Sequence, residues 1–147
     1  MQRFSDLMVF SWLLVNTKEF RNVMFNRLHR NIICRVLFKP LEGLYINMPP
    51  ENIGGVYIQH GFATIIAAKK IGENCSINQQ VTIGYNGEYV PIIGDDVTIA
   101  AGSIVVGDVC IENNATVGAG AVVVHDVFEN EVVAGVPAKV IKKSVEK

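Results

Sequence analysis

Between residues 53 and 128 an aliphatic residue recurs at every sixth position, apart from one exception and one insertion. A second series, of small or β-branched residues, follows the first by four positions. A period of six fits neither an amphipathic helix nor an alternating strand. The first series comprises Ile53, Ile65, Ile71, Ile77, Ile83, Ile93, Ile99, Val105, Ile111, Val117 and Val123. The second comprises Ala63, Cys75, Val81, Val97, Ser103, Val109, Ala115, Ala121 and Val127.

This period predicts a parallel β-helix in which each hexapeptide forms one short strand and one corner, with three hexapeptides to a coil. The aliphatic residues then point inward, and Gly, Asn and Asp supply the corners. Four extra residues fall within GYNGEYVPI, residues 84–92. Loops that depart from a repeat commonly carry function. The predicted coils are 53–70, 71–92, 93–110 and 111–128.

Residues 1–44 lack the period and form a separate segment. The stretch EFRNVMFNRLHRNIICRVLF, residues 19–38, spaces its apolar residues as a helix does, so we expect two or three helices near the first coil. The β-helix domain then covers 45–147, with a tail from about residue 138 that flanks the last coil as a helix or strand. The fold class is therefore β, with a short N-terminal helical segment.

Charge is distributed unevenly along the chain. Residues 1–40 hold seven Lys or Arg against two Asp or Glu, although the whole chain has a net charge of −1. Apolar residues interleave with these cations, so the segment either packs on the first coil or makes a peripheral membrane contact. The apolar run 8–15 is too short to span a bilayer. Nothing in the sequence points to nucleic acid.

The three cysteines are odd in number and widely spaced, and they form no CxxC motif. This pattern indicates free thiols and a cytoplasmic location, with the inner face of the membrane as the alternative within that compartment.

His60 lies in IQHGFATII, residues 58–66, beside Gln59, the single exception to the inward series. Coils of 18 residues predict that His60 shares a column with Asn78, Ala100 and Gly118. The adjacent column then holds Gly61, Gln79, Ala101, Ala119 and Pro137. Small residues would thus form a track leading to the histidine. Such a track suits a long, thin ligand that hydrogen-bonds to backbone.

The C-terminal segment IENNATVGAGAVVVHDVFENEVVAGVPAKVI resembles the terminal repeats of hexapeptide-repeat acyltransferases. Together with IQHGFATII and PIIGDDVTIAAGSIVVGD, it looks like the serine acetyltransferase branch and its relatives in surface-polysaccharide gene sets. The resemblance covers residues 45–141. It implies a left-handed β-helix, an exception to the usual right-handed crossover. It also implies a homotrimer that binds acetyl-CoA as cosubstrate between neighbouring subunits.

By matching position, the resemblance assigns the catalytic base to His60. Histidine suits that role because its neutral imidazole is available near pH 7. The resemblance also implies cofactor contacts from the Ala101 and Ala119 corners, from Gly84 at the start of the loop, and from Lys139 near the CoA phosphates.

The acceptor is less directly indicated. Serine acetyltransferases carry acidic and histidine partners where this chain has Tyr45, Gln59 and Val90. We therefore expect a sugar hydroxyl of cell-surface polysaccharide synthesis, contacted by Tyr45, Gln59 and Gln79. Charged residues elsewhere, such as Lys69, Lys70 or Glu88, could replace the missing partners, so serine remains an alternative. A non-catalytic β-helical scaffold is a second alternative.

No metal site is predicted. A zinc site in such a fold needs three convergent imidazoles. The other two histidines, His29 and His125, lie off the predicted His60 track.

Overall fold

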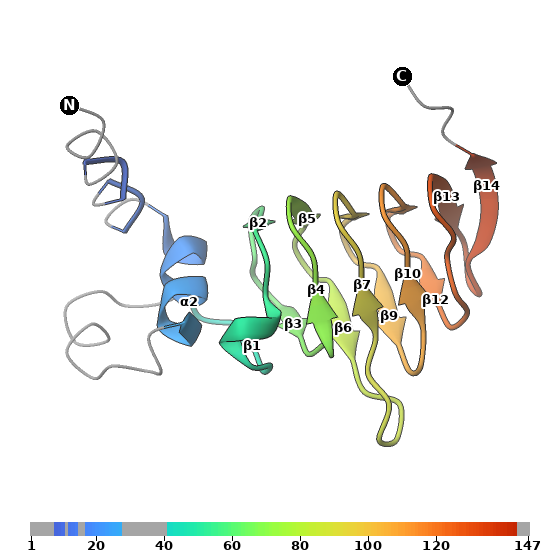
Figure 1. The fold of residues 1–147 in the computed structure, drawn as a ribbon, viewed down its shortest axis with the longest axis horizontal. Coiled ribbons are helices and arrows are strands. Elements are labelled where there is room, and N and C mark those ends of the chain that lie inside the picture. The colour runs from blue at the N-terminus through green and yellow to red at the C-terminus, as the bar shows by residue number, and fades with distance from the viewer. Residues whose placement is uncertain (1–7, 11, 15–16, 28–40, 144–147) are drawn as a thin grey trace.

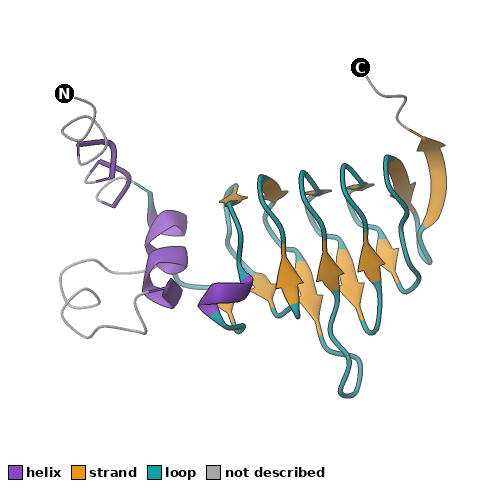
Figure 2. Cartoon of the chain, viewed as in Figure 1, coloured by secondary structure: helices purple, strands orange, loops and turns teal. Residues whose placement is uncertain are grey.

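The computed structural model describes residues 8–10, 12–14, 17–27 and 41–143. Short strands stack along the long axis of the molecule, with helix α2 (Lys18–Arg27) at one end and strand β14 (Lys139–Lys143) at the other (Figure 1). The strands form three faces of a prism (Figure 2), as a left-handed parallel β-helix requires. The predicted fold class is confirmed.

Three sheets make these faces, and all strand pairs in them are parallel except β13–β14. The five-stranded sheet contains β1 (Leu44–Ile46), β3 (Thr64–Ile66), β6 (Thr82–Gly84), β9 (Ile104–Val106) and β12 (Val122–Val123). The three-stranded sheet contains β4 (Lys70–Ile71), β7 (Ile92–Ile93) and β10 (Cys110–Ile111). The six-stranded sheet contains β2 (Val56–Ile58), β5 (Cys75–Ile77), β8 (Thr98–Ile99), β11 (Thr116–Val117), β13 (Glu131–Ala134) and β14.

The core is a stack of inward aliphatic side chains. Ile77, Ile99 and Val117 lie in neighbouring strands in register, and each is fully buried. Cys75, predicted at a small inward position, is buried as well. Because each coil presents its side chains directly above those of the preceding coil, a period of six in the sequence becomes a continuous apolar column.

The predicted register of the first coil is wrong around His60. Ile65, predicted to point inward, is 44% exposed, whereas Thr64 and Ile66 on either side of it are 0% and 2% exposed. Ala63 is exposed too, and Ile58 takes the inward place expected at position 59. The coil still closes after 18 residues, since Ile53 bridges to Ile71. Its strands and corners, however, divide that length differently from the later coils.

Each prism edge has its own corner chemistry. At the edge between the three- and six-stranded sheets, here called the ladder edge, left-handed backbone recurs at Asn74, Asp96 and Asn114. Side chains there cap the amides of the preceding coil. Glu73 Oε2 accepts from Gly55 N (2.6 Å), Asp95 Oδ1 from Glu73 N (2.8 Å) and Asn113 Oδ1 from Asp95 N (2.8 Å). This ladder ties the coils together where no strand pairing is available.

Helix α2 covers the open edge of the first strand. Asn22 Nδ2 donates to Leu44 O (3.0 Å) and Leu41 O (3.1 Å), and Asn22 Oδ1 accepts from Leu41 N (2.7 Å). One turn later Asn26 Nδ2 donates to Met48 O (3.2 Å) and to Ile46 O (3.4 Å). These amides satisfy backbone groups that an uncovered edge strand would leave open to other chains.

The other end of the prism is closed by a hairpin. β14 runs antiparallel to β13, and Lys143 Nζ lies 3.3 Å from the buried Glu131 carboxylate. The tail is therefore a strand, one of its two predicted forms.

The helical prediction for residues 1–44 is only partly tested. Residues 8–10, 12–14 and α2 are helical, whereas 28–40, which include more than half of the predicted helical stretch 19–38, lie outside the described residues. No helix among the described residues is long and apolar enough to cross a membrane.

Replacing Asn22 by Ala should lower the free energy of unfolding by about 1–3 kcal/mol, because partly buried backbone groups at residues 41 and 44 lose their partners. Urea denaturation measures the change. Asn47→Ala serves as the control, since the Asn47 side chain is exposed and should be replaced with little effect. Equal stability of the two variants would mean that α2 does not depend on Asn22 for its position.

Candidate functional site

The corner that carries His60 is two residues longer than the corners stacked above it. It joins the six-stranded to the five-stranded sheet, at what we call the His60 edge. Gln59 N donates to Ile77 O (2.9 Å), and Gln80 N donates to Phe62 O (3.0 Å). Gln59 therefore stacks on Asn78, and Phe62 stacks on Gln79, which leaves His60 and Gly61 without counterparts in the next coil.

The predicted columns need the same correction. Gln59, in place of His60, heads the column of Asn78, Ala100 and Gly118. Phe62, in place of Gly61, heads the column of Gln79, Ala101 and Ala119. The two inserted residues explain both errors, and they place His60 on a protruding corner.

The protruding corner is held in one conformation. His60 adopts left-handed backbone (φ 56°), and its carbonyl accepts a hydrogen bond from Phe62 N. Gly61 is buried, and a Cβ built there would lie 2.8 Å from Ile58 Cγ2 and 3.1 Å from Leu44 Cδ2. Only glycine fits without displacement, so the corner is packed against the core while the His60 side chain stays exposed.

A cavity of about 470 Å³ lies between this corner and the N-terminal helical residues. The floor comes from the first coil, including Ile58, Gln59 and His60. The opposite wall comes from α2, with apolar side chains such as Phe20 and with the carboxylate-bearing Glu19. A concave, mostly apolar space with a few polar groups is the usual character of a small-molecule site. His60 thus faces a cavity large enough for an acceptor molecule.

The small-residue track predicted along the His60 edge is present. A Cβ built at Gly120 would meet nothing within 4 Å, and one at Gly102 would meet only Gly120 N at 4.0 Å. Ala101 and Ala119 lie beside these glycines in the same corners. The track reaches the last coil, where Ala138 N donates to Val122 O and exposed Lys139 pairs with Ala134. Open space above the backbone fits a thin ligand, and a lysine at the end fits an anionic group.

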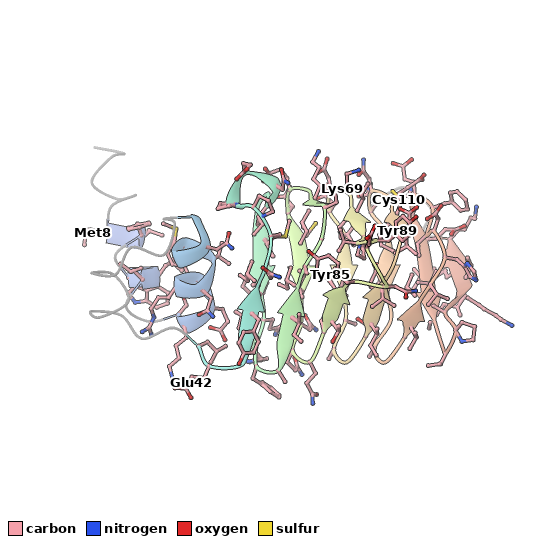
Figure 3. The ribbon with its side chains drawn as sticks, turned by 90° about the horizontal axis from the view of Figure 1, so that it is seen from below. Met8, Glu42, Lys69, Tyr85, Tyr89 and Cys110 are labelled. Carbon is pink, nitrogen blue, oxygen red and sulfur yellow. The ribbon has the colours of Figure 1, made fainter. Side chains whose placement is uncertain are left out.

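Gly84 does not lie on that track. It ends β6, at the edge between the five- and three-stranded sheets, so a whole sheet separates it from Ala101 and Ala119 within one chain. The loop that follows folds on itself through two backbone hydrogen bonds between Asn86 and Tyr89. Tyr85 and Tyr89 are exposed on this loop (Figure 3), which defines the edge that we call the loop edge.

The predicted acceptor residues are dispersed. Gln59 lines the cavity with His60, whereas Gln79 lies at the His60 edge one coil further along. Tyr45 is on the outer face of the five-stranded sheet, paired with Ile65, and does not line the cavity. The charged residues that could replace the missing partners do not line the cavity either. Lys69 and Lys70 lie at the start of the three-stranded face, and Glu88 is in the loop.

Glu19 is a functional candidate that the sequence alone does not identify. Its helical spacing to Asn22, Val23 and Asn26 indicates that all four share one face of α2. That spacing could have marked the face as buried, but it could not show which corner the face would meet.

Thiol and metal chemistry find no support near His60. Burial raises the pKa of the Cys75 thiol above its ordinary value. The pKa of Cys110 is raised too, by burial and then by the charges of Asp126 and Glu112, which disfavours the thiolate. Within the described part of the chain no three His, Cys, Asp or Glu side chains gather as a metal site would need. His125 is exposed, and His29 lies outside the described residues.

Comparison with known proteins agrees with this architecture. Residues 91–125 match the family described as bacterial transferase hexapeptide (six repeats). A serine acetyltransferase of Staphylococcus epidermidis is 39% identical over 101 residues, which is 65% of this chain and 47% of the relative. The chain thus spans about half the length of this curated relative.

Solved structures of serine acetyltransferases also share this fold. The serine acetyltransferase of Neisseria gonorrhoeae superposes with a TM-score of 0.72 at 29% identity, over 93% of this chain and 59% of that one. The same enzyme in complex with serine superposes with a TM-score of 0.71 at 31% identity, over 88% of this chain and 59% of that one.

Proposed function

We propose that the chain is an acetyl-CoA-dependent O-acetyltransferase of the hexapeptide-repeat family, in the branch that resembles serine acetyltransferases. The observation that carries this proposal is the location of His60. It stands on a fixed corner, between a cavity for an acceptor and a track of small residues that can accommodate CoA. A non-catalytic scaffold would have no use for this combination.

In the proposed reaction the acceptor occupies the cavity and acetyl-CoA lies along the His60 edge. The neutral imidazole of His60 takes the proton of the acceptor hydroxyl as its oxygen attacks the thioester carbonyl. The tetrahedral intermediate then collapses with cleavage of the C–S bond. The imidazolium returns the proton to the departing sulfur, so the products are the acetyl ester and CoA.

The proposed acceptor is serine. The relatives described above are serine acetyltransferases, and none of them supports the saccharide acceptor, or the role in polysaccharide synthesis, that the sequence predicted. A saccharide remains the second candidate on one observation: Gln59, which replaces an acidic residue beside the histidine, lines the cavity with a neutral amide.

A homotrimer would complete the cofactor site. The outer face of the five-stranded sheet is mostly apolar, with Tyr45 64%, Ile65 44% and Ile104 37% exposed and only Thr82 polar between Ile65 and Ile104. The matching outer row of the six-stranded sheet has a polar middle, at Ser76, Thr98 and Thr116, with Tyr57 and Val132 at its ends. Exposed apolar faces of this kind mark protein interfaces.

Three copies packed through this face would set the His60 edge of each chain beside the loop edge of its neighbour. That arrangement would bring Gly84 of one subunit to Ala101 and Ala119 of the next. It would unite residues that the single chain keeps apart.

A cytoplasmic location with peripheral membrane contact remains a prediction. Met8, Val9 and Trp12 are exposed, as membrane contact would require. Phe10 instead packs edge-to-face on Phe20 with ring centroids 5.7 Å apart, as packing within the protein would require.

His60→Ala should lower turnover with acetyl-CoA and acceptor by at least about 100-fold, because the general base is lost. CoA release followed with a thiol reagent measures this, and His125→Ala provides the control because His125 is an exposed histidine of the fourth coil that does not line the cavity. Near-normal turnover of His60→Ala, with its fold intact by circular dichroism, would remove His60 from the mechanism.

Serine should be acetylated with a kcat/KM of at least about 10⁴ M⁻¹s⁻¹, the lower end for enzymes acting on their own substrates. Hexoses and N-acetylhexosamines should react more slowly. Steady-state assays of the purified chain across this panel decide between the two acceptors, since a saccharide with the higher kcat/KM would replace serine.

Ile104→Glu should convert the trimer to monomers, because three carboxylates would be buried in an apolar interface. Thr98→Glu, on the polar outer row of the six-stranded sheet, should leave the trimer unchanged. Sedimentation equilibrium at micromolar concentration measures both. If the Ile104→Glu protein were still a trimer, the subunits would associate through another face.

A further inference from the structure

Glu19 brings a carboxylate to the cavity that His60 faces. It lies in the first turn of α2 and lines the cavity together with Gln59 and His60. Its Cγ lies 3.5 Å from the position that a Cβ would occupy on Gly61, the residue next to His60. The Glu19 side chain therefore lies next to the protruding corner.

The position of this carboxylate is set by the docking of α2. Glu19 shares a helix face with Asn22, which is fixed to Leu41 and Leu44 by three hydrogen bonds, and with Val23, which packs against the core. One helical turn separates Glu19 from this anchor. The distance between the helix and the His60 corner is thus determined by the same contacts that cover the first strand.

The carboxylate has an environment that favours a cationic ligand. No hydrogen bond or ion pair joins it to another residue of the described part of the chain. Its neighbours along the cavity wall, Phe20, Val23 and Met24, are apolar. A carboxylate beside apolar groups attracts a cation more strongly than one in open water, because screening is weaker there.

We propose that Glu19 determines acceptor specificity by binding an ammonium group of the acceptor whose hydroxyl is presented to His60. This inference rests on the proposed function. Glu19 would be the charged partner that is missing at Tyr45, Gln59 and Val90. That partner would then come from helix α2, outside the β-helix. The acceptor class is then an amino alcohol or hydroxy amino acid with a free amine.

The test compares serine, which has a free ammonium, with N-acetylserine, in which that nitrogen is a neutral amide. Glu19→Gln keeps the size of the side chain and removes its charge. Its kcat/KM for serine should fall about 10- to 100-fold, mainly through KM, as expected for loss of a hydrogen bond between charged groups. Its kcat/KM for N-acetylserine should stay within about twofold of the wild-type value.

Two further variants serve as controls. Glu51→Gln removes an exposed carboxylate from the 3₁₀ helix Pro50–Asn52, outside the cavity, and should not change the preference for serine. Glu19→Asp keeps the charge and should restore part of the preference. If Glu19 had only a structural role, Glu19→Gln would lower kcat/KM for serine and for N-acetylserine by the same factor.

The outcomes separate this inference from the proposed function. If Glu19→Gln keeps the wild-type preference for serine, Glu19 does not bind the ammonium, although the enzyme is still an acetyltransferase. If the wild-type chain acetylates neither compound, the proposed function fails, and calorimetric titration with serine decides on Glu19 alone. Binding weakened at least about tenfold in Glu19→Gln supports the inference, and equal or absent binding overturns it.

Discussion

Hydrogen bonding between successive coils is the constraint on which the whole structure depends. Every strand in the body of the prism takes its partners from the coil before it and the coil after it. A residue can therefore leave its column only if the coil compensates elsewhere. The inward side chains, stacked in register, exclude water from these short strands. The apolar column and the backbone ladder thus stabilise each other.

The first coil shows how this constraint accommodates a functional departure. Two residues are added at the His60 corner, and the flanking segments shorten so that Ile53 still bridges to Ile71. The coil keeps its length while one corner protrudes. Packing of Gly61 against Ile58 and Leu44 then fixes that corner. Rigidity from the solenoid is what allows a single exposed histidine to hold a defined position, as a catalytic group must.

Both ends of the prism and one of its faces expose groups that need to be covered. Two of these regions, the end under α2 and the apolar face of the five-stranded sheet, adjoin the proposed site. A β-solenoid exposes unpaired strand edges at its ends. α2 covers the first edge through Asn22 and Asn26, and in doing so it encloses the cavity beside His60. The apolar outer face of the five-stranded sheet lies between the His60 edge and the loop edge. A contact that buries this face would also complete a groove between them.

The sequence by itself determined the repeat, the prism and the inward column from Ile71 onward, because the period of six is a local property that every coil repeats. It also marked His60, the long loop and the small-residue corners. It misplaced Gln59, Ala63 and Ile65, since an insertion compensated within one coil leaves the overall period unchanged. Only the tertiary structure showed that Gly84 lies a sheet away from the track and that Tyr45 is outside the cavity. It also brought Glu19 to the His60 corner. That contact depends on how a helix docks on a coil distant in sequence, and helical periodicity specifies which face is buried but not what the face will meet.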